Sequence, residues 1–264
     1  PVARPPAILV RGVNSGVISV ELLNIYWGIS IENTDGTEAG LTQRTKIWDL
    51  TGQPLYRGIT MGLGNENAGG SYTGILDVPE IKFMFNPWWS YPQPGTPMAG
   101  NPGQFNWMLG NAVAIDVGDA DEAYFFNCFA FGYGIGARFQ KFNRGCYGAW
   151  IGGGFDTCTR CVQVLDTNYP GIAFEGTSFG QPSGVTNGGL AVAGGVVLVN
   201  GGRFFNQNPA AVVTGGATSL TGCNFGNVGT HVTQSGGAVN VVGGMAKGGF
   251  TSTGTVSSTG VMSY

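Results

Sequence analysis

Charged side chains are scarce in this sequence. Only 10% of the 264 residues are Asp, Glu, Lys or Arg, and the formal net charge is -3. No basic cluster occurs, which argues against nucleic acid as a partner. No run of 18 or more apolar residues occurs, so no transmembrane segment is predicted. Helical periodicity with capping residues is also nearly absent, which argues against an α-helical fold.

The few charges are unevenly distributed. All 15 acidic residues lie at or before Glu175, and of the Asp, Glu, Lys, Arg and His residues only Arg203, His231 and Lys247 lie in residues 176–264. A segment so poor in charge stays in solution through Gly, Ser, Thr and Asn at its surface, or because neighbouring chains cover it. We therefore predict a homo-oligomer, either a trimer or an end-to-end filament.

Glycine is abundant, with 48 residues, and it marks a repeat. Short runs rich in β-branched residues are bounded by Gly, Asn, Ser or Thr, the pattern of short strands between turns. Similar tetrapeptides begin at the evenly spaced positions Gly201, Gly222 and Gly243, and an earlier member begins at Gly176. A period of about 21 residues is typical of solenoids. The Leu/Asn ladder of leucine-rich repeats and the helix formers of helical repeats are both missing.

Three short strands and three turns account for the length of one coil, with the Phe, Cys and Met residues of the repeats stacked in a narrow core. We therefore predict an all-β fold, a single-stranded right-handed parallel β-helix (solenoid) with protruding loops. It forms one domain over residues 1–264 and lacks some N-terminal coils. Residues 176–264 form its Gly-rich, low-charge coils, and the tail after residue 250 continues the stack.

Two segments depart from the repeat. Residues 86–107 are rich in proline, which cannot donate to a strand ladder, so we predict a protruding aromatic loop there. A second excursion is expected from Gly62 to Gly74. The candidate substrate-binding residues are the aromatic residues of the first loop: Trp88, Trp89, Tyr91 and Trp107. Three interpretations stay open, namely a platform for a glycan, a contact with another subunit, and a cover over the core.

Three segments resemble a known family. Asp77–Ile81, Asn86–Trp89 and Phe129–Phe139 look like elements of pectate-lyase-superfamily β-helix proteins, which include polysaccharide lyases, glycoside hydrolases and phage tailspikes. The resemblance covers residues 20–225, and its motifs are structural. It implies the β-helix fold and a polysaccharide partner, with an extracellular, cell-surface or virion location. The calcium-binding acids of pectate lyases and the paired aspartates of polygalacturonases have no match in this sequence.

Carboxylates are the candidate catalytic residues, because glycoside hydrolysis needs two of them. Asp119, Asp121 and Glu122 cluster near Asp116. In a strand, Asp119 and Asp121 would point to one side, whereas the alternative is a solvated turn. Asp156 follows three glycines, where backbone can approach a ligand closely. Its alternative is a turn aspartate bonded to its own backbone.

Other ligands and cofactors have weaker signals. No cofactor is predicted, although the same acidic cluster could bind calcium through its oxygens. The five cysteines suit a buried core, with a bridge from Cys146 to Cys158 or Cys161 as the alternative in an oxidising compartment. His231, the single histidine, is interpreted as a turn residue.

Two hypotheses for function follow. In the first, the chain is an enzyme, a polysaccharide hydrolase or lyase. Its groove would be walled by the loops at 62–74 and 86–107, and acids from 116–122 and Asp156 would cleave the glycan. In the second, it is a non-catalytic structural, adhesin or filament-forming module. We favour an extracellular or virion-surface protein that binds polysaccharide, and leave its ability to depolymerise that polysaccharide open.

Overall fold

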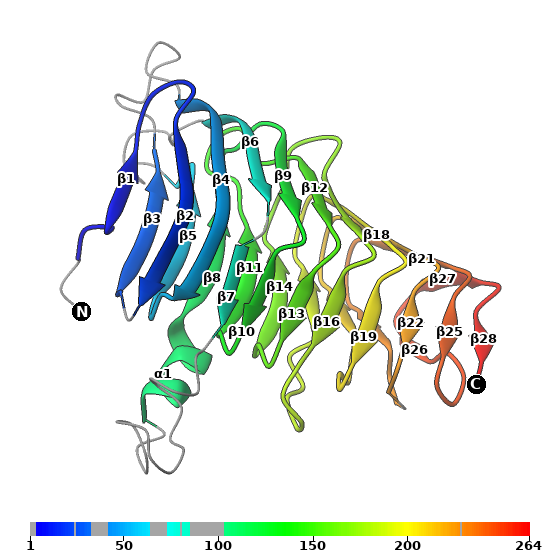
Figure 1. Ribbon diagram of the computed structural model, residues 1–264. Coiled ribbons are helices and arrows are strands. Elements are labelled where there is room, and N and C mark those ends of the chain that lie inside the picture. Colours follow the sequence, from blue (N-terminus) through cyan, green and yellow to red (C-terminus); the bar gives the residue numbers. More distant parts are fainter. Residues whose placement is uncertain are drawn as a thin grey trace.

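The computed structural model describes residues 4–23, 25–32, 42–63, 73–79, 81–84, 103–227 and 229–264. These residues form short β-strands and one helix, α1 (Gly103–Asn111). Every strand pairing that is described is parallel, and the strands stack along one axis from the N-terminal to the C-terminal end of the chain (Figure 1). The predicted parallel β-solenoid is confirmed.

One side of the stack is a ten-stranded parallel sheet, which we call sheet A. Its strands are β1 (Ile8–Val10), β3 (Trp27–Ile31), β5 (Arg57–Met61), β8 (Val113–Val117), β11 (Ile135–Phe139), β14 (Arg160–Val164), β17 (Leu190–Val192), β20 (Ala211–Val213), β23 (Val232–Gln234) and β26 (Ser252–Thr253).

The remaining strands form two further rows, which β4 joins because it pairs with both β6 and β7. Row B contains β2 (Gly16–Leu23), β4 (Thr42–Gln53), β6 (Thr73–Pro79), β9 (Ala123–Phe126), β12 (Gly148–Ile151), β15 (Ile172–Glu175), β18 (Val196–Asn200), β21 (Ala217–Thr221), β24 (Ala238–Val242) and β27 (Val256–Thr259). Row C contains β7 (Ile81–Met84), β10 (Phe129–Phe131), β13 (Gly154–Asp156), β16 (Ser178–Gly180), β19 (Arg203–Phe205), β22 (Asn224–Phe225), β25 (Met245–Ala246) and β28 (Met262–Ser263). From β8 onward each coil has one strand of each kind, as expected, and the tail does continue the stack.

Aromatic rings fill the core in register. Phe179 pairs with Phe204, and Phe204 pairs with Phe225, in neighbouring strands of row C. Their ring centroids are 4.6 and 5.3 Å apart with nearly parallel planes. The predicted phenylalanine stack is therefore confirmed. The expectation that Met245 joins it is wrong, because Met245 is 41% exposed and Ala246 occupies the buried position.

The repeated glycines lie at the corner between rows B and C. Gly201, Gly222 and Gly243 have φ angles of +64°, +62° and +63°. This left-handed conformation suits glycine, which has no Cβ to clash with the following carbonyl. Each coil turns at this point, and the even spacing of the three glycines reflects that turn.

Helix α1 corrects the predicted loop at 86–107, since residues 103–107 are helical. The helix has no acidic residue in its first turn and no basic residue in its last, so the charge signals of helix ends are missing. Trp88, Trp89 and Tyr91 lie outside the described residues, as does most of the expected excursion at 62–74. Of the segments that the structure describes, none is an apolar helix of the length needed to traverse a lipid bilayer.

Candidate functional site

A groove of about 420 Å³ lies where α1 meets the first residues of three neighbouring strands of sheet A. Val113, Ile135 and Arg160 form one row across β8, β11 and β14, and all three line the groove. Residues 109–112, at the end of the helix, and Arg138 also line it. Among the residues that the structure describes, the lining includes two arginines and no acidic residue. We call this site the α1 groove.

The end of α1 is fixed to two successive coils of the solenoid. The backbone N–H of Gly134 donates to the Met108 carbonyl at 2.9 Å, and the Thr159 hydroxyl donates to the Leu109 carbonyl at 2.7 Å. The last carbonyls of a helix have no partner within the helix, so these bonds satisfy them. The side chain of Met108 is fully buried. The helical part of the groove is thus held in place by the stack beneath it.

Three aromatic rings adjoin the groove. Tyr26 and Tyr56 stack with their centroids 4.9 Å apart, and Trp107 lies 5.8 Å from Tyr56 and 6.4 Å from Tyr26. Tyr56 also lines the groove. Trp107 is 39% exposed and the two tyrosines are half-buried. We call these three residues the aromatic cluster, and it continues the groove toward the N-terminal coils.

Two arginines lie over this aromatic surface. The guanidinium of Arg57 is 5.3 Å from the ring centroid of Tyr56 and 5.6 Å from that of Trp27. The guanidinium of Arg4 is 5.6 Å from the ring centroid of Tyr26. Such cation–π contacts hold a charged group at an aromatic face and leave its other donors available. The surface beside the groove therefore combines flat rings with positive charge.

Asp116 is already neutralised within the fold. It pairs in register with Arg138 across β8 and β11. Its carboxylate accepts hydrogen bonds from Nε of Arg138 at 2.9 Å, from Nη2 of the same residue, and from Nε2 of Gln140 at 2.8 Å. Asp116 is completely buried. A two-pronged bond between guanidinium and carboxylate is strong and directional, so this pair is part of the framework of the site.

Asp119, one of the predicted catalytic residues, anchors a turn. Its carboxylate accepts hydrogen bonds from the backbone N–H groups of four consecutive residues, Phe142, Asn143, Arg144 and Gly145, at 2.6–3.2 Å. Only 1% of Asp119 is exposed. A carboxylate so enclosed holds the loop between β11 and β12 in shape.

Asp121 and Glu122 lie in the same bend after β8, and each is half-buried. The expectation that Asp119 and Asp121 share one face of a strand is wrong, because the bend has no strand alternation at these positions. Glu122 has a positive φ of +50°, which marks a tight turn. The backbone of this cluster therefore forms a turn, which was the alternative interpretation.

Asp156, the last residue of β13, lies at a different corner. Its Oδ1 accepts a hydrogen bond from the Thr157 hydroxyl at 3.3 Å. Asp156 precedes the sheet A strand β14, whereas Asp119 follows the sheet A strand β8. The two corners are separated by a five-residue strand, about 16 Å at 3.3 Å per residue. Paired carboxylates of glycoside hydrolases lie about 5–9.5 Å apart. The structure thus does not bring Asp156 together with the acids of 119–122.

The five cysteines are all free and buried, so the alternative of a bridge from Cys146 is wrong. Burial raises the pKa of the Cys146 thiol, and the charges of Asp119 and Asp121 raise it further. Burial also raises the pKa of Cys158 to about 12. These thiols pack as small apolar groups. No cluster of three or more His, Cys, Asp or Glu residues that could hold a metal ion occurs in the described ranges.

His231 lies in a bend, as expected, but is completely buried. Its Nδ1 accepts a hydrogen bond from the backbone N–H of Thr251 at 3.1 Å, and its Nε2 lies 2.9 Å from the carbonyl oxygen of Asn227. The ring stacks on Phe250 at 5.6 Å. Nδ1 is therefore the acceptor and Nε2 the donor, and the histidine is a polar element of the core.

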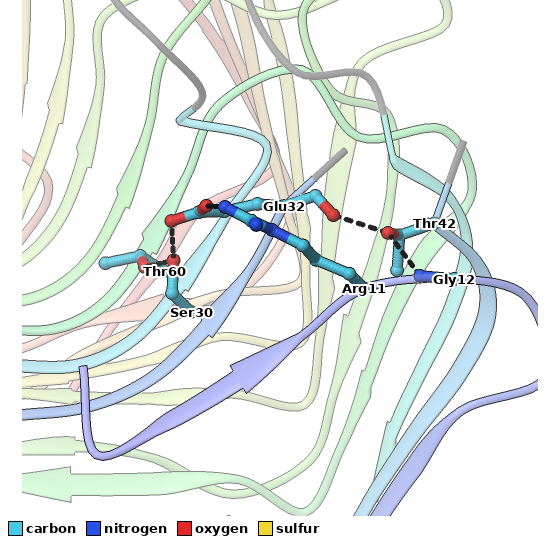
Figure 2. A network of polar contacts seen from close by, with 6 residues as sticks. All are labelled: Arg11, Gly12, Ser30, Glu32, Thr42 and Thr60. Atoms are coloured by element: carbon cyan, nitrogen blue, oxygen red, sulfur yellow. Dashed lines mark hydrogen bonds and ion pairs between the residues drawn. The ribbon is translucent and has the colours of Figure 1, made fainter. Parts of the chain in front are cut away.

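A second polar network ties the N-terminal coils together (Figure 2). Arg11 pairs with Glu32 at 3.0 Å, and Ser30 donates to the same carboxylate at 2.7 Å. The Thr60 hydroxyl donates to Ser30 at 3.0 Å, and the Thr42 hydroxyl donates to the Glu32 carbonyl. Each group has its partner within the fold, so this network joins β1, β3, β4 and β5 and leaves no charge in excess.

The sequence analysis missed Tyr26, Tyr56 and Arg160. A signal for the two tyrosines was present, because Tyr26-Trp27-Gly28-Ile29 and Tyr56-Arg57-Gly58-Ile59 share one pattern in consecutive coils. In parallel coils such residues stack, as Trp27 and Arg57 do in register. Trp107 was selected for its aromatic ring, and the structure places it on the two tyrosines.

Comparison with known proteins finds no match for this chain among protein-family models, curated proteins or solved structures. The description of the site therefore rests on its own geometry.

Proposed function

We propose that this protein binds a polysaccharide, with the α1 groove as the binding site and the aromatic cluster as its platform. The observation that carries the proposal is the position of Tyr56, which lines the groove and also stacks with Tyr26 and Trp107. A chain-like ligand can therefore lie in the groove and extend over Trp107 and the half-buried tyrosines.

The chemistry of the lining suits sugars. Aromatic faces pack against the apolar C–H side of a sugar ring, and polar groups around them fix its hydroxyls. Asn111, Thr159 and the two arginines line the groove beside Val113. Such a mixture of a few polar groups with apolar floor residues is the usual make-up of a ligand site.

The positions of the acidic residues favour binding of the polysaccharide without its cleavage. Asp119 is enclosed by backbone N–H groups, and Asp156 lies at the opposite end of the sheet A strands from Asp119. Polysaccharide hydrolysis or lysis by this chain stays an untested hypothesis. We place the protein outside the cytoplasm, at a cell surface or on a virion, where glycans are encountered.

Self-association is part of the same proposal. After Glu175, the row B strands carry a line of paired residues on their outer side. These residues are Leu198, Ser219, Asn240 and Ser257, and none of them is charged. A neutral sheet face of this kind suits contact between copies of the chain. The mass in solution over a range of dilutions would test for a trimer or a filament.

The test is binding of a polysaccharide panel to the wild type and to Trp107→Ala. Removal of an aromatic contact residue costs about 1–4 kcal/mol of binding, so affinity should fall about fivefold or more. Tyr169→Ala is the matched control, because Tyr169 is 84% exposed and lies in the turn after β14, at the opposite ends of the sheet A strands. It should bind as the wild type does.

Two results would count against the proposal. One is a wild type that binds no member of the panel. The other is a Trp107→Ala variant that keeps full affinity while its melting temperature is unchanged. An assay for new reducing ends and unsaturated uronates on the same samples separates binding from depolymerisation.

A further inference from the structure

Arg160 holds an unusual position in the α1 groove. It is the first residue of β14, and its side chain lines the groove. Its guanidinium makes one long hydrogen bond, from Nη2 to the Asn187 carbonyl at 3.4 Å. Its Nε is buried and has no hydrogen-bond partner in the part of the chain that the structure describes. Among the described residues no carboxylate pairs with it, in contrast to Arg138, which is bonded to Asp116.

A half-buried guanidinium without a counter-charge is unfavourable, because the charge loses part of its hydration and gains little in return. The same loss of water lowers the pKa of Arg160. Arginine nonetheless stays protonated, since its pKa lies far above neutral. The groove therefore offers a permanent positive charge with free donors, and an anion that enters it would restore the missing partner.

The surroundings favour an oxyanion over other ligands. The planar guanidinium matches a carboxylate or a sulfate, which can accept two parallel hydrogen bonds. Asp116 does not compete, because Arg138 and Gln140 already occupy its oxygens. The helix end at Leu109 does not oppose an anion strongly, because its carbonyl is already bonded to Thr159.

A second arginine extends the site along the stack. Arg57, Val113, Ile135 and Arg160 occupy one row across β5, β8, β11 and β14. Arg57 and Arg160 are thus three strand spacings apart, about 14 Å at 4.8 Å per strand. Arg57 also lies over the ring of Tyr56. One sugar ring does not span this distance, whereas a polymer with acidic groups along it does.

We propose that the α1 groove selects an acidic polysaccharide, with the guanidinium of Arg160 binding the carboxylate or sulfate of one sugar residue. Arg57 provides a second positive contact further along the chain. This inference rests on the proposed glycan binding and adds the chemical class of the glycan to it.

The experiment compares each charged glycan with its neutral counterpart. Polygalacturonate is paired with its carboxyl-reduced form, and dextran sulfate with dextran, so that carboxylate and sulfate are distinguished. Affinities are measured at 0.15 M salt, where charges more than about 8 Å apart are largely screened. Wild type, Arg160→Gln, Arg160→Lys and the control Arg203→Gln are compared, since Arg203 is an exposed arginine on β19. Melting temperatures confirm that each variant is folded.

We expect the wild type to bind the charged member of at least one pair tenfold or more tightly than the neutral member. Arg160→Gln should remove this preference while keeping the neutral affinity, and Arg160→Lys should restore only part of it because lysine lacks the two-pronged geometry. Arg203→Gln should behave as the wild type.

Equal affinity for both members of each pair would overturn the anionic selectivity and leave glycan binding intact. An equal loss in Arg203→Gln would overturn it in favour of general charge attraction. A wild type that binds no glycan, charged or neutral, would overturn both proposals.

Discussion

At the scale of single residues, Asp119 shows how an acid that suits catalysis by sequence can serve the fold. The backbone N–H groups of residues 142–145 all point at its carboxylate, and almost none of it reaches the solvent. Hydrogen bonds to a charged group contribute about 1.5–3 kcal/mol, and buried donors left unpaired add a further cost. We therefore expect Asp119→Asn to lower the free energy of unfolding by about 2–4 kcal/mol, measured by urea denaturation.

The matched control for this change is Glu122→Gln, in the same bend. Glu122 is half-buried, and the substitution removes the same charge and keeps the shape of the side chain. We expect a change within about 0.5 kcal/mol, as for an ordinary surface position. Equal effects of the two variants would show that the charge of the cluster, and not the bonds of Asp119, stabilises the turn.

Single residues of the site were predictable only where the residue type itself carries the signal. Trp107 could be selected because an aromatic residue in a segment without strand pattern suggests a contact surface. Arg160 could not, because its distinction is that no carboxylate of the described residues pairs with it, and this depends on the distances between β14 and those acids. The burial of Asp119 depends in the same way on the loop after β11, which follows it only after three intervening strands.

At the scale of elements, the phenylalanine stack fixes the register of row C. In β19, Phe204 points into the core at 1% exposure, whereas the neighbouring Phe205 points outward and is half-buried. Phe204→Ala should therefore cost about 3–5 kcal/mol of unfolding free energy, as expected for a buried aromatic residue. Phe205→Ala should cost about 1 kcal/mol. A reversed order in chemical denaturation would indicate that β19 is shifted by one residue.

Elements were predictable to the degree that they repeat. The strands of residues 176–264 follow a nearly constant period, because each parallel coil places equivalent residues above one another. Helix α1 interrupts that period between β7 and β8, and its weak amphipathic pattern and uncharged end turns gave little local signal. Its position over sheet A comes from tertiary bonds such as that between Gly134 and Met108. The groove exists because of those bonds, so its location could not be read from the repeat.

At the scale of the whole molecule, protonated thiols and a tyrosine hydroxyl that are buried along the stack make the stability of the fold depend on pH. Burial raises the pKa of Cys158 to about 12 and that of Cys223 to about 11, and it also raises the pKa values of Cys146, Cys161 and Tyr133. In the unfolded chain a thiol has its ordinary pKa, near 9. The unfolded state therefore releases protons first as pH rises. Each thiol contributes stability that is complete below pH 9 and is lost as the pH approaches its folded value.

We expect the free energy of unfolding to be flat near neutral pH and to fall steeply between about pH 9 and pH 11. Each buried thiol accounts for about 1.4 kcal/mol per pH unit in this window. Urea denaturation under reducing conditions, repeated from pH 7.5 to 10.5, measures the curve. Cys158→Ala should make the alkaline slope shallower by about that amount, even if the variant is less stable at neutral pH. Two results would contradict this expectation: an unchanged alkaline slope in Cys158→Ala, or a wild type that is as stable at pH 10.5 as at pH 7.5. Either would show that the thiols ionise within the folded stack, and therefore that water reaches the core.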